Sequence, residues 1–162
     1  MDIKGKTVMV AGATSGLGLA VAQCFAGRGA NVVLLGRRGE LAAKLAAQIG
    51  DTALGVGADT TKPEQVAAAF DAAIARFGTI DVNVNTAGIQ GYVPLVGPDG
   101  APFDLAEFTR LWTTNVVGTY TMMSRAAAVM LANGPDADGE RGVIISTSSV
   151  AGEDRHAGLR GH

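Results

Sequence analysis

The sequence TVMVAGATSGLGLAVAQCFAG, residues 7–27, joins three structural signals in one segment. Residues 7–11 form a short apolar run rich in valine, which is typical of a strand buried on both faces of a parallel sheet. A turn of small residues follows, and it contains Gly12, Gly16 and Gly18. Apolar residues then recur at helical spacing until Gly27. The segment therefore predicts a strand, a glycine-rich turn and a helix.

This order of elements is typical of a phosphate-binding site. Glycine has no Cβ, so its backbone turns tightly and approaches a ligand closely. The first turn of the helix directs unpaired N–H groups at the turn, and a pyrophosphate fits there. The spacing is G-x-x-x-G-x-G, which differs from the common dinucleotide pattern G-x-G-x-x-G. The alternative is a glycine-rich turn without a ligand.

The predicted helix carries one apolar face, which we expect to pack against the sheet. Its members are Leu17, Ala20, Val21, Cys24 and Phe25. Cys24 is the only cysteine in the chain, so no disulfide is predicted, and we expect its thiol to be a small buried apolar group.

Length and composition predict one globular domain. The chain has 162 residues and a formal net charge of −2, with basic and acidic residues interspersed. It has no basic arm for nucleic acid, no polybasic membrane patch and no apolar run long enough to span a bilayer. The N-terminal MDIKGKT has no apolar signal region. We therefore expect a cytoplasmic protein without a metal site, a membrane segment or a nucleic-acid partner.

The rest of the chain alternates between apolar runs and helical patterns. Further strands are predicted at 31–35, 52–58, 80–85 and 143–147. Helices are predicted at 40–49, from a capping box at 61–64 to Phe77, and from Asp104 to Leu131 with a break near Thr113. The loop 89–103 is expected to expose Tyr92, Val93, Leu95 and Val96. This alternation predicts an α/β fold with a doubly wound parallel sheet.

Chemically distinctive residues follow the predicted strands. In a parallel sheet, the carboxyl ends of the strands lie along one edge, where ligands bind near the switch in strand order. The segments expected there are the glycine turn, Arg37, Asp59, Asn85 and Ser149. Their convergence predicts one nucleotide site.

These motifs resemble the short-chain dehydrogenase/reductase family. The matching residues are Gly12-Ala13-Thr14-Ser15-Gly16-Leu17-Gly18, Asp59, Asn85-Thr86-Ala87-Gly88, Asn115 and Ser148-Ser149. They follow the family's order and spacing from residue 4 to about residue 152. Two positions depart from the family pattern: Ala11 stands where threonine is frequent, and Thr86 stands where a second asparagine is frequent.

The resemblance implies a Rossmann-like fold and a bound nicotinamide cofactor. The residues expected to contact it are Gly12, Thr14, Ser15, Gly16, Leu17, Gly18, Arg37, Asp59, Thr60, Asn85, Ala87 and Gly88. The three glycines would hold the pyrophosphate, and Asp59 would bind the adenine amino group. Alternatively, Asp59 is an acid at a helix N-terminus and Asn85 a turn former.

Arg37 bears on the choice of cofactor. Enzymes that prefer NAD usually place an acid at the end of the second strand, where it binds the ribose hydroxyls. Gly36 stands at that place here, and Arg37 and Arg38 follow. A guanidinium there can pair with a 2′-phosphate, which favours NADP, with NAD as the other possibility. Alternatively, both arginines are solvated charges at a helix start.

The resemblance also implies hydride transfer to or from a secondary alcohol or carbonyl. Ser149 would orient the substrate oxygen, and Asn115 would support a water in a proton relay. The loops 89–103 and 133–141 are most similar to type-2 3-hydroxyacyl-CoA dehydrogenases, which favours a small-molecule 3-hydroxyacyl substrate. Family members commonly assemble through the long helix, here 105–131, so a homo-oligomer is expected.

The family's catalytic Tyr-x-x-x-Lys does not occur in this sequence. Residues 153–162 do not resemble the family, so we expect a domain at 1–152 followed by a tail, from a truncated or frame-shifted gene product that lacks the last strands. His156 and His162 lie near the tyrosine's expected place, but we do not expect either to replace it. The alternative function is therefore a nucleotide-binding or interaction module without turnover.

Overall fold

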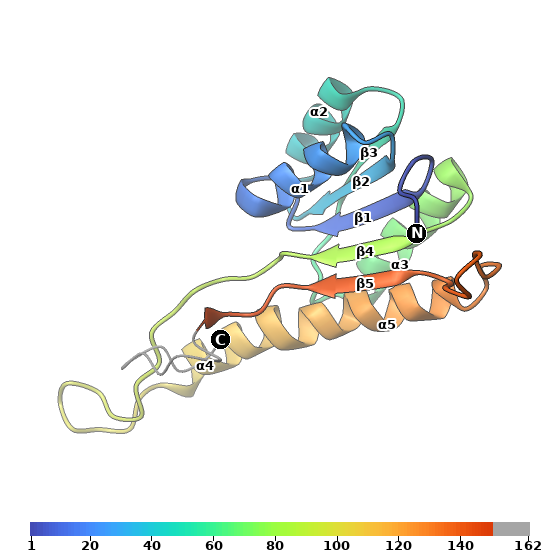
Figure 1. Ribbon diagram of the computed structural model, residues 1–162. Coiled ribbons are helices and arrows are strands. Elements are labelled where there is room, and N and C mark those ends of the chain that lie inside the picture. Colours follow the sequence, from blue (N-terminus) through green and yellow to red (C-terminus); the bar gives the residue numbers. More distant parts are fainter. Residues whose placement is uncertain (151–162) are drawn as a thin grey trace.

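Five parallel strands form one sheet in the order β3-β2-β1-β4-β5 in the computed structural model, which describes residues 1–150 (Figure 1). The strands are β1 (Thr7–Ala11), β2 (Asn31–Gly36), β3 (Ala53–Gly57), β4 (Val82–Asn85) and β5 (Val143–Ser146). The order reverses between β1 and β4, as in a doubly wound sheet. The predicted fold class is therefore confirmed.

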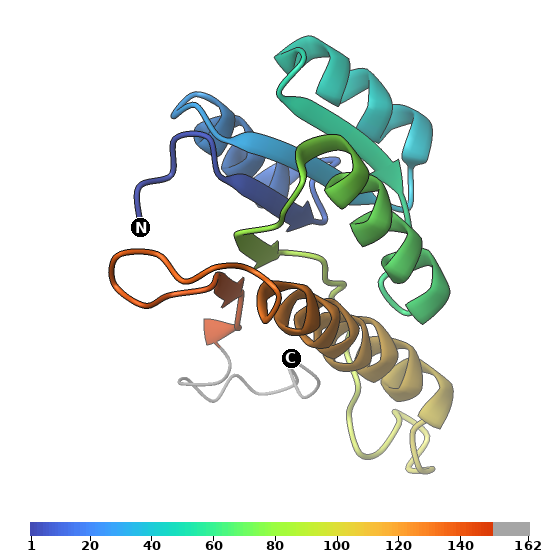
Figure 2. The same ribbon diagram turned by 90° about the vertical axis from the view of Figure 1, so that its right-hand side faces the viewer.

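Helices cover both faces of this sheet (Figures 1 and 2). They are α1 (Gly16–Ala26), α2 (Gly39–Ile49), α3 (Pro63–Phe77), α4 (Leu105–Trp112) and α5 (Gly118–Met130), with a π-helical turn, η1 (Thr113–Val117), between the last two. Side chains of β1 alternate between the two layers: Val8 and Val10 pack with Ala22 of α1. Met9 packs with Phe70 of α3 and Met122 of α5. The strand is therefore buried on both sides, as its valine-rich sequence predicts.

Helix α1 packs through a face that matches the predicted one only in part, since Val21 and Phe25 pack against the core as expected. Its fully buried residues are Gly18 and Ala22, whereas Leu17 is 74% exposed and the Cys24 thiol is exposed. The small residues allow α1 to approach the sheet closely, and this rotates the larger Leu17 and Cys24 outward. Ala20 is exposed as well, so the expected burial of Leu17, Ala20 and Cys24 was wrong.

Two other local expectations also need correction. Thr61 does not form the predicted capping box, because its hydroxyl donates to Asp59 Oδ1 (2.9 Å) and Lys62 occupies the N-cap of α3 without a side-chain bond. Val93 is only 9% exposed, although the other three apolar residues expected on the surface of its loop are exposed. By contrast, Asp104 caps α4 as predicted, since its Oδ1 accepts from the Ala106 amide (2.9 Å).

The predicted break in the long helix is the π-helical turn that begins at Thr113. A π turn admits one extra residue per turn and is frequent at functional sites. Here it carries Asn115, whose side chain bonds the backbone of a neighbouring segment. None of the helices within residues 1–150 is long and apolar enough to cross a membrane.

The centre of β4 holds a buried polar side chain. Asn83 is fully buried beside Met9 of β1 and Ile144 of β5, and neither its Oδ1 nor its Nδ2 has a hydrogen-bond partner. Burial of an amide without a partner costs about 1–3 kcal/mol. Asn83 therefore lowers the stability of the sheet.

We predict that Asn83→Leu raises the free energy of unfolding by about 2 kcal/mol, because leucine has a similar branched shape and no polar atoms to desolvate. Urea denaturation followed by circular dichroism measures this change. Asn83→Asp, which buries a charge at the same position, should destabilise the chain. A destabilised Asn83→Leu variant would show that the native amide is satisfied.

Candidate functional site

A large cavity lies at the carboxyl ends of the strands, between the turn after β1, the start of α2 and the inner side of α4. Its volume is about 1140 Å³, enough for a dinucleotide-sized ligand. Predicted site residues that line it are Gly12, Thr14, Ser15, Leu17, Gly18, Arg37, Asp59, Thr60, Ala87 and Gly88. The sheet edge thus brings together residues that are far apart in the sequence.

The floor of the cavity is a backbone-to-backbone contact between two strand ends. Gly12 has a positive φ of 81°, and a Cβ at this position would lie 2.8 Å from the Ala87 nitrogen. A Cβ on Gly18 would lie 2.4 Å from the Gly12 carbonyl oxygen. Because real Cβ atoms do not approach other atoms this closely, only glycine fits at both positions without a shift of the turn.

Thr86 holds these strand ends together. Its hydroxyl donates to the Ala11 carbonyl (2.6 Å), and its amide donates to the same oxygen (3.1 Å). The Thr86 Oγ1 would lie 2.5 Å from a Cβ on Gly18, so it also packs against α1. The sequence showed Thr86 only as a departure from the family pattern, because its bonds depend on the register of β1 and β4.

The N-terminus of α1 faces this cavity without a competing acid. Ser15 is the N-cap, and its side chain makes no capping bond. The first turn contains no acidic residue, so the positive end of the helix dipole is not neutralised from within the helix. Both features suit a bound anion. Gly16 has a positive φ of 54° at the first position of α1, although it does not line the cavity.

Asp59 lies at the opposite end of the cavity, after β3. Its Oδ1 accepts from the Thr61 amide and the Thr61 hydroxyl, both at 2.9 Å. The hydrogen bonds from the Thr61 amide and hydroxyl, together with the positive charges of Arg37 and Lys62, hold the pKa of Asp59 below its usual value. Partial burial acts in the opposite direction but is outweighed. Asp59 is therefore ionised at neutral pH and can accept a further hydrogen bond from a ligand.

The two arginines after β2 have different surroundings. Arg38 donates from Nη2 to the Thr14 carbonyl (3.3 Å) and to the Thr14 hydroxyl (3.1 Å). Both arginines line the main cavity, and within residues 1–150 the Arg37 side chain forms no hydrogen bond or ion pair. It also lines a smaller cavity of about 460 Å³ beside it, together with Asp59 and Gln65. Arg37 is therefore available to a ligand. The sequence alone does not distinguish the two arginines.

Asn85 and Asn115 stand behind the cavity and do not line it. Asn85 is 2% exposed, and its Nδ2 donates to the Ser146 hydroxyl (3.0 Å), which joins β4 to β5. Asn115 brackets one residue: its Oδ1 accepts from the Ile89 amide and its Nδ2 donates to the Ile89 carbonyl, both at 2.9 Å. Asn115 thus holds the segment after β4, whose Ala87 and Gly88 do line the cavity, whereas Asn85 holds the end of β5.

Ser149 lies after β5 and does not line the main cavity. The tail from residue 153, with His156 and His162, lies outside the described residues.

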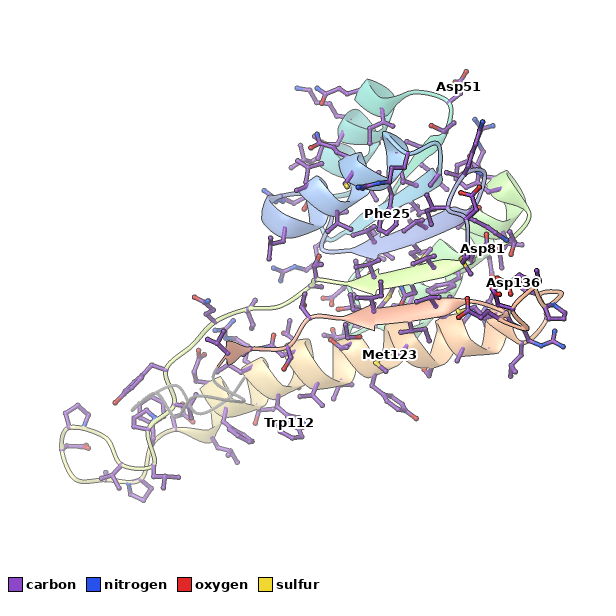
Figure 3. The ribbon with its side chains drawn as sticks, in the orientation of Figure 1. Phe25, Asp51, Asp81, Trp112, Met123 and Asp136 are labelled. Carbon is purple, nitrogen blue, oxygen red and sulfur yellow. The ribbon has the colours of Figure 1, made fainter. Side chains whose placement is uncertain are left out.

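Sequence reasoning missed the outer wall of the cavity, which comes from α4 and η1: Ala106, Thr109, Arg110, Thr113 and Thr114. Only the three-dimensional course of the long helix brings these residues to the strand ends. On the other side of the helix, Trp112 projects away from the sheet (Figure 3).

The chain is similar to known proteins over nearly its whole length. Residues 6–160 match the model of the short chain dehydrogenase family. The sequence is 36% identical to the 3-hydroxyacyl-CoA dehydrogenase type-2 of Drosophila melanogaster over 96% of this chain and 62% of that protein. The human protein of the same name is also 36% identical, over 97% of this chain and 60% of that protein.

Solved structures agree with this similarity. A 3-hydroxyacyl-CoA dehydrogenase type-2 from Mycobacterium avium matches with a TM-score of 0.89 and 31% identity, over 96% of this chain and 60% of that one. A 3-ketoacyl-(acyl-carrier-protein) reductase from Brucella melitensis, complexed with NADH, matches with a TM-score of 0.83 and 36% identity, over 97% and 62%. The chain thus spans about three fifths of these relatives' length, and it belongs to the short chain dehydrogenase family of oxidoreductases.

Proposed function

We propose that this chain binds NADP(H) and serves hydride transfer to or from a secondary alcohol or carbonyl compound. The observation that carries the proposal is the cavity in front of α1, whose floor has no room for side chains at Gly12 and Gly18. Such a floor lets the backbone contact a pyrophosphate directly.

We also propose that the protein is located in the cytoplasm. Its single cysteine, Cys24, is exposed and unpaired, which is consistent with a reducing compartment.

The residues present fit this cofactor. The N–H groups at the start of α1 would bind the pyrophosphate, Asp59 and Thr60 the adenine, and Arg37 a 2′-phosphate. Asn115 would keep the segment after β4 in place through its two bonds to Ile89. When bound, the nicotinamide ring would supply or accept the hydride. The α4 wall would exclude water from one side of the cavity.

The substrate is proposed by class. Relatives named 3-hydroxyacyl-CoA dehydrogenase and 3-ketoacyl-(acyl-carrier-protein) reductase support a 3-hydroxyacyl or 3-ketoacyl thioester. Ser149 would orient the substrate oxygen. We assign no general acid within residues 1–162, because the two tyrosines, Tyr92 and Tyr120, have no lysine four residues later. That sequence fact favours the second candidate, a nucleotide-binding module without turnover.

We predict that the 162-residue chain binds NADPH more tightly than NADH, and that Arg37→Ala weakens NADPH binding about 10- to 100-fold with little effect on NADH. A titration that follows energy transfer from Trp112, which is 52% exposed, to the reduced nicotinamide measures both affinities. Lys44→Ala removes an exposed positive charge from α2 outside the cavity and is the matched control. An equal loss of affinity for NADPH and NADH in Arg37→Ala would contradict a role of Arg37 in binding the 2′-phosphate.

We predict that Gly18→Ala lowers the free energy of unfolding by about 2 kcal/mol and abolishes measurable NADPH binding, because its methyl group would press on Gly12 and Thr86. Gly134→Ala adds a methyl group where no atom lies within 4 Å and should change neither quantity. Urea denaturation and the same titration measure the two effects. Tight NADPH binding by Gly18→Ala would place the cofactor elsewhere.

We also propose that the chain forms a homo-oligomer through the long helix. Exposed apolar side chains follow one another along α4, η1 and α5, and Phe108 stacks on Trp112 at 5.9 Å. The exposed members are Leu105, Phe108, Trp112, Val116, Val117, Tyr120 and Met123, with Leu131 directly after α5. A surface of this kind is typical of an interface between subunits.

Light scattering coupled to size-exclusion chromatography should therefore give a mass of at least a dimer for the parent chain. The double variant Val116→Lys/Met123→Lys should run as a monomer with an unchanged circular dichroism spectrum, since two charges would enter the interface. A monomeric parent chain at high micromolar concentration would refute this assembly.

A further inference from the structure

The last residue of β2, Gly36, has no space for a side chain. A Cβ at this position would lie 2.8 Å from Thr14 Cγ2 and 3.2 Å from Thr14 Oγ1. Gly36 is not among the glycines with a positive φ, so its backbone conformation would accept any residue. The side chain of Thr14, not the backbone of Gly36, therefore excludes larger residues here.

Thr14 is fixed in this position by Arg38. The Arg38 Nη2 donates to both the carbonyl and the hydroxyl of Thr14. Threonine is branched at Cβ, so a rotation that moves its methyl group away from Gly36 also moves its hydroxyl away from Arg38. The hydrogen bond from Arg38 to the Thr14 hydroxyl therefore also keeps the Thr14 methyl group beside Gly36.

Position 36 is where a nicotinamide-binding sheet of this kind carries its acid for the ribose hydroxyls of NAD. An acid at this place would compete with Arg37 for the same end of the ligand and would repel a 2′-phosphate. In the described part of the chain the Arg37 side chain forms no hydrogen bond or ion pair, whereas Arg38 donates to Thr14. Arg38 therefore positions Thr14, and Arg37 is available to bind the ligand.

We infer that Thr14, held by Arg38, is a specificity-determining residue: it fills the space that an acidic side chain at position 36 needs and so keeps the site selective for a 2′-phosphorylated dinucleotide. The inference rests on the proposed binding of NADP(H). It adds that selectivity has a steric part, set by Thr14, besides the charge of Arg37.

Three variants separate this steric part from the charge. Gly36→Asp introduces the acid under the native Thr14. Thr14→Ser/Gly36→Asp removes the methyl group and keeps the hydroxyl for Arg38, and Thr14→Val/Gly36→Asp keeps both branches of the side chain and removes the hydroxyl. For each variant and for the parent chain, the melting temperature and the dissociation constants of NADH and NADPH are measured.

We expect Gly36→Asp to melt below the parent and to bind both cofactors at least about tenfold more weakly. In Thr14→Ser/Gly36→Asp the melting temperature should recover in part, because the hydroxyl that remains lies 3.2 Å from the Cβ position and the closer methyl group is gone. NADH should bind at least about tenfold more tightly than in Gly36→Asp and more tightly than NADPH. Thr14→Val/Gly36→Asp should remain as impaired as Gly36→Asp, because the methyl group is still present.

Two results would overturn the inference, and they are distinguishable. If the parent binds NADPH and Gly36→Asp alone binds NADH as tightly as the Thr14→Ser double variant, the proposed function stands and Thr14 has no steric role. If the parent binds neither cofactor, the proposed function fails, and the selectivity assigned to Thr14 fails with it.

Discussion

The close contact between the end of β1 and the end of β4 is the constraint on which the site depends. A Cβ on Gly12 would lie 2.8 Å from the Ala87 nitrogen, and the Thr86 hydroxyl closes the same junction by its bond to the Ala11 carbonyl. This junction lies where the strand order reverses, so α1 begins directly in front of it. The helix N-terminus, the glycine turn and the segment after β4 consequently share one cavity.

Hydrogen bonds of polar side chains in and behind the cavity fix its walls. Asn115 uses both atoms of its amide on Ile89, which ties the π-helical turn to the segment after β4. Arg38 uses its guanidinium on Thr14 and so ties the start of α2 to the glycine turn. These bonds would limit the reorganisation of the site when a ligand binds, and in the proposed function Arg37 and Asp59 would contact that ligand.

The sequence was sufficient for the parts of the site that depend on strand order. Glycines after a buried strand and polar residues at strand ends predicted where the cavity lies, because parallel strands end along one edge. The burial of Leu17 and Cys24 was predicted wrongly, since α1 carries apolar residues around much of its circumference and the close packing at Gly18 and Ala22 selects its inner face. The α4 wall and the different roles of Arg37 and Arg38 depend on contacts between distant segments, which no local pattern contains.

In the function proposed above, the glycine turn and the segment after β4 together hold the pyrophosphate of a nicotinamide dinucleotide. Hydrogen–deuterium exchange of the 162-residue chain, with and without saturating NADPH, tests it most directly. We expect slower exchange of the backbone amides in residues 13–18 and 86–89, with little change in α2 beyond its first turn. Saturable NADPH binding that leaves both segments unprotected would contradict it.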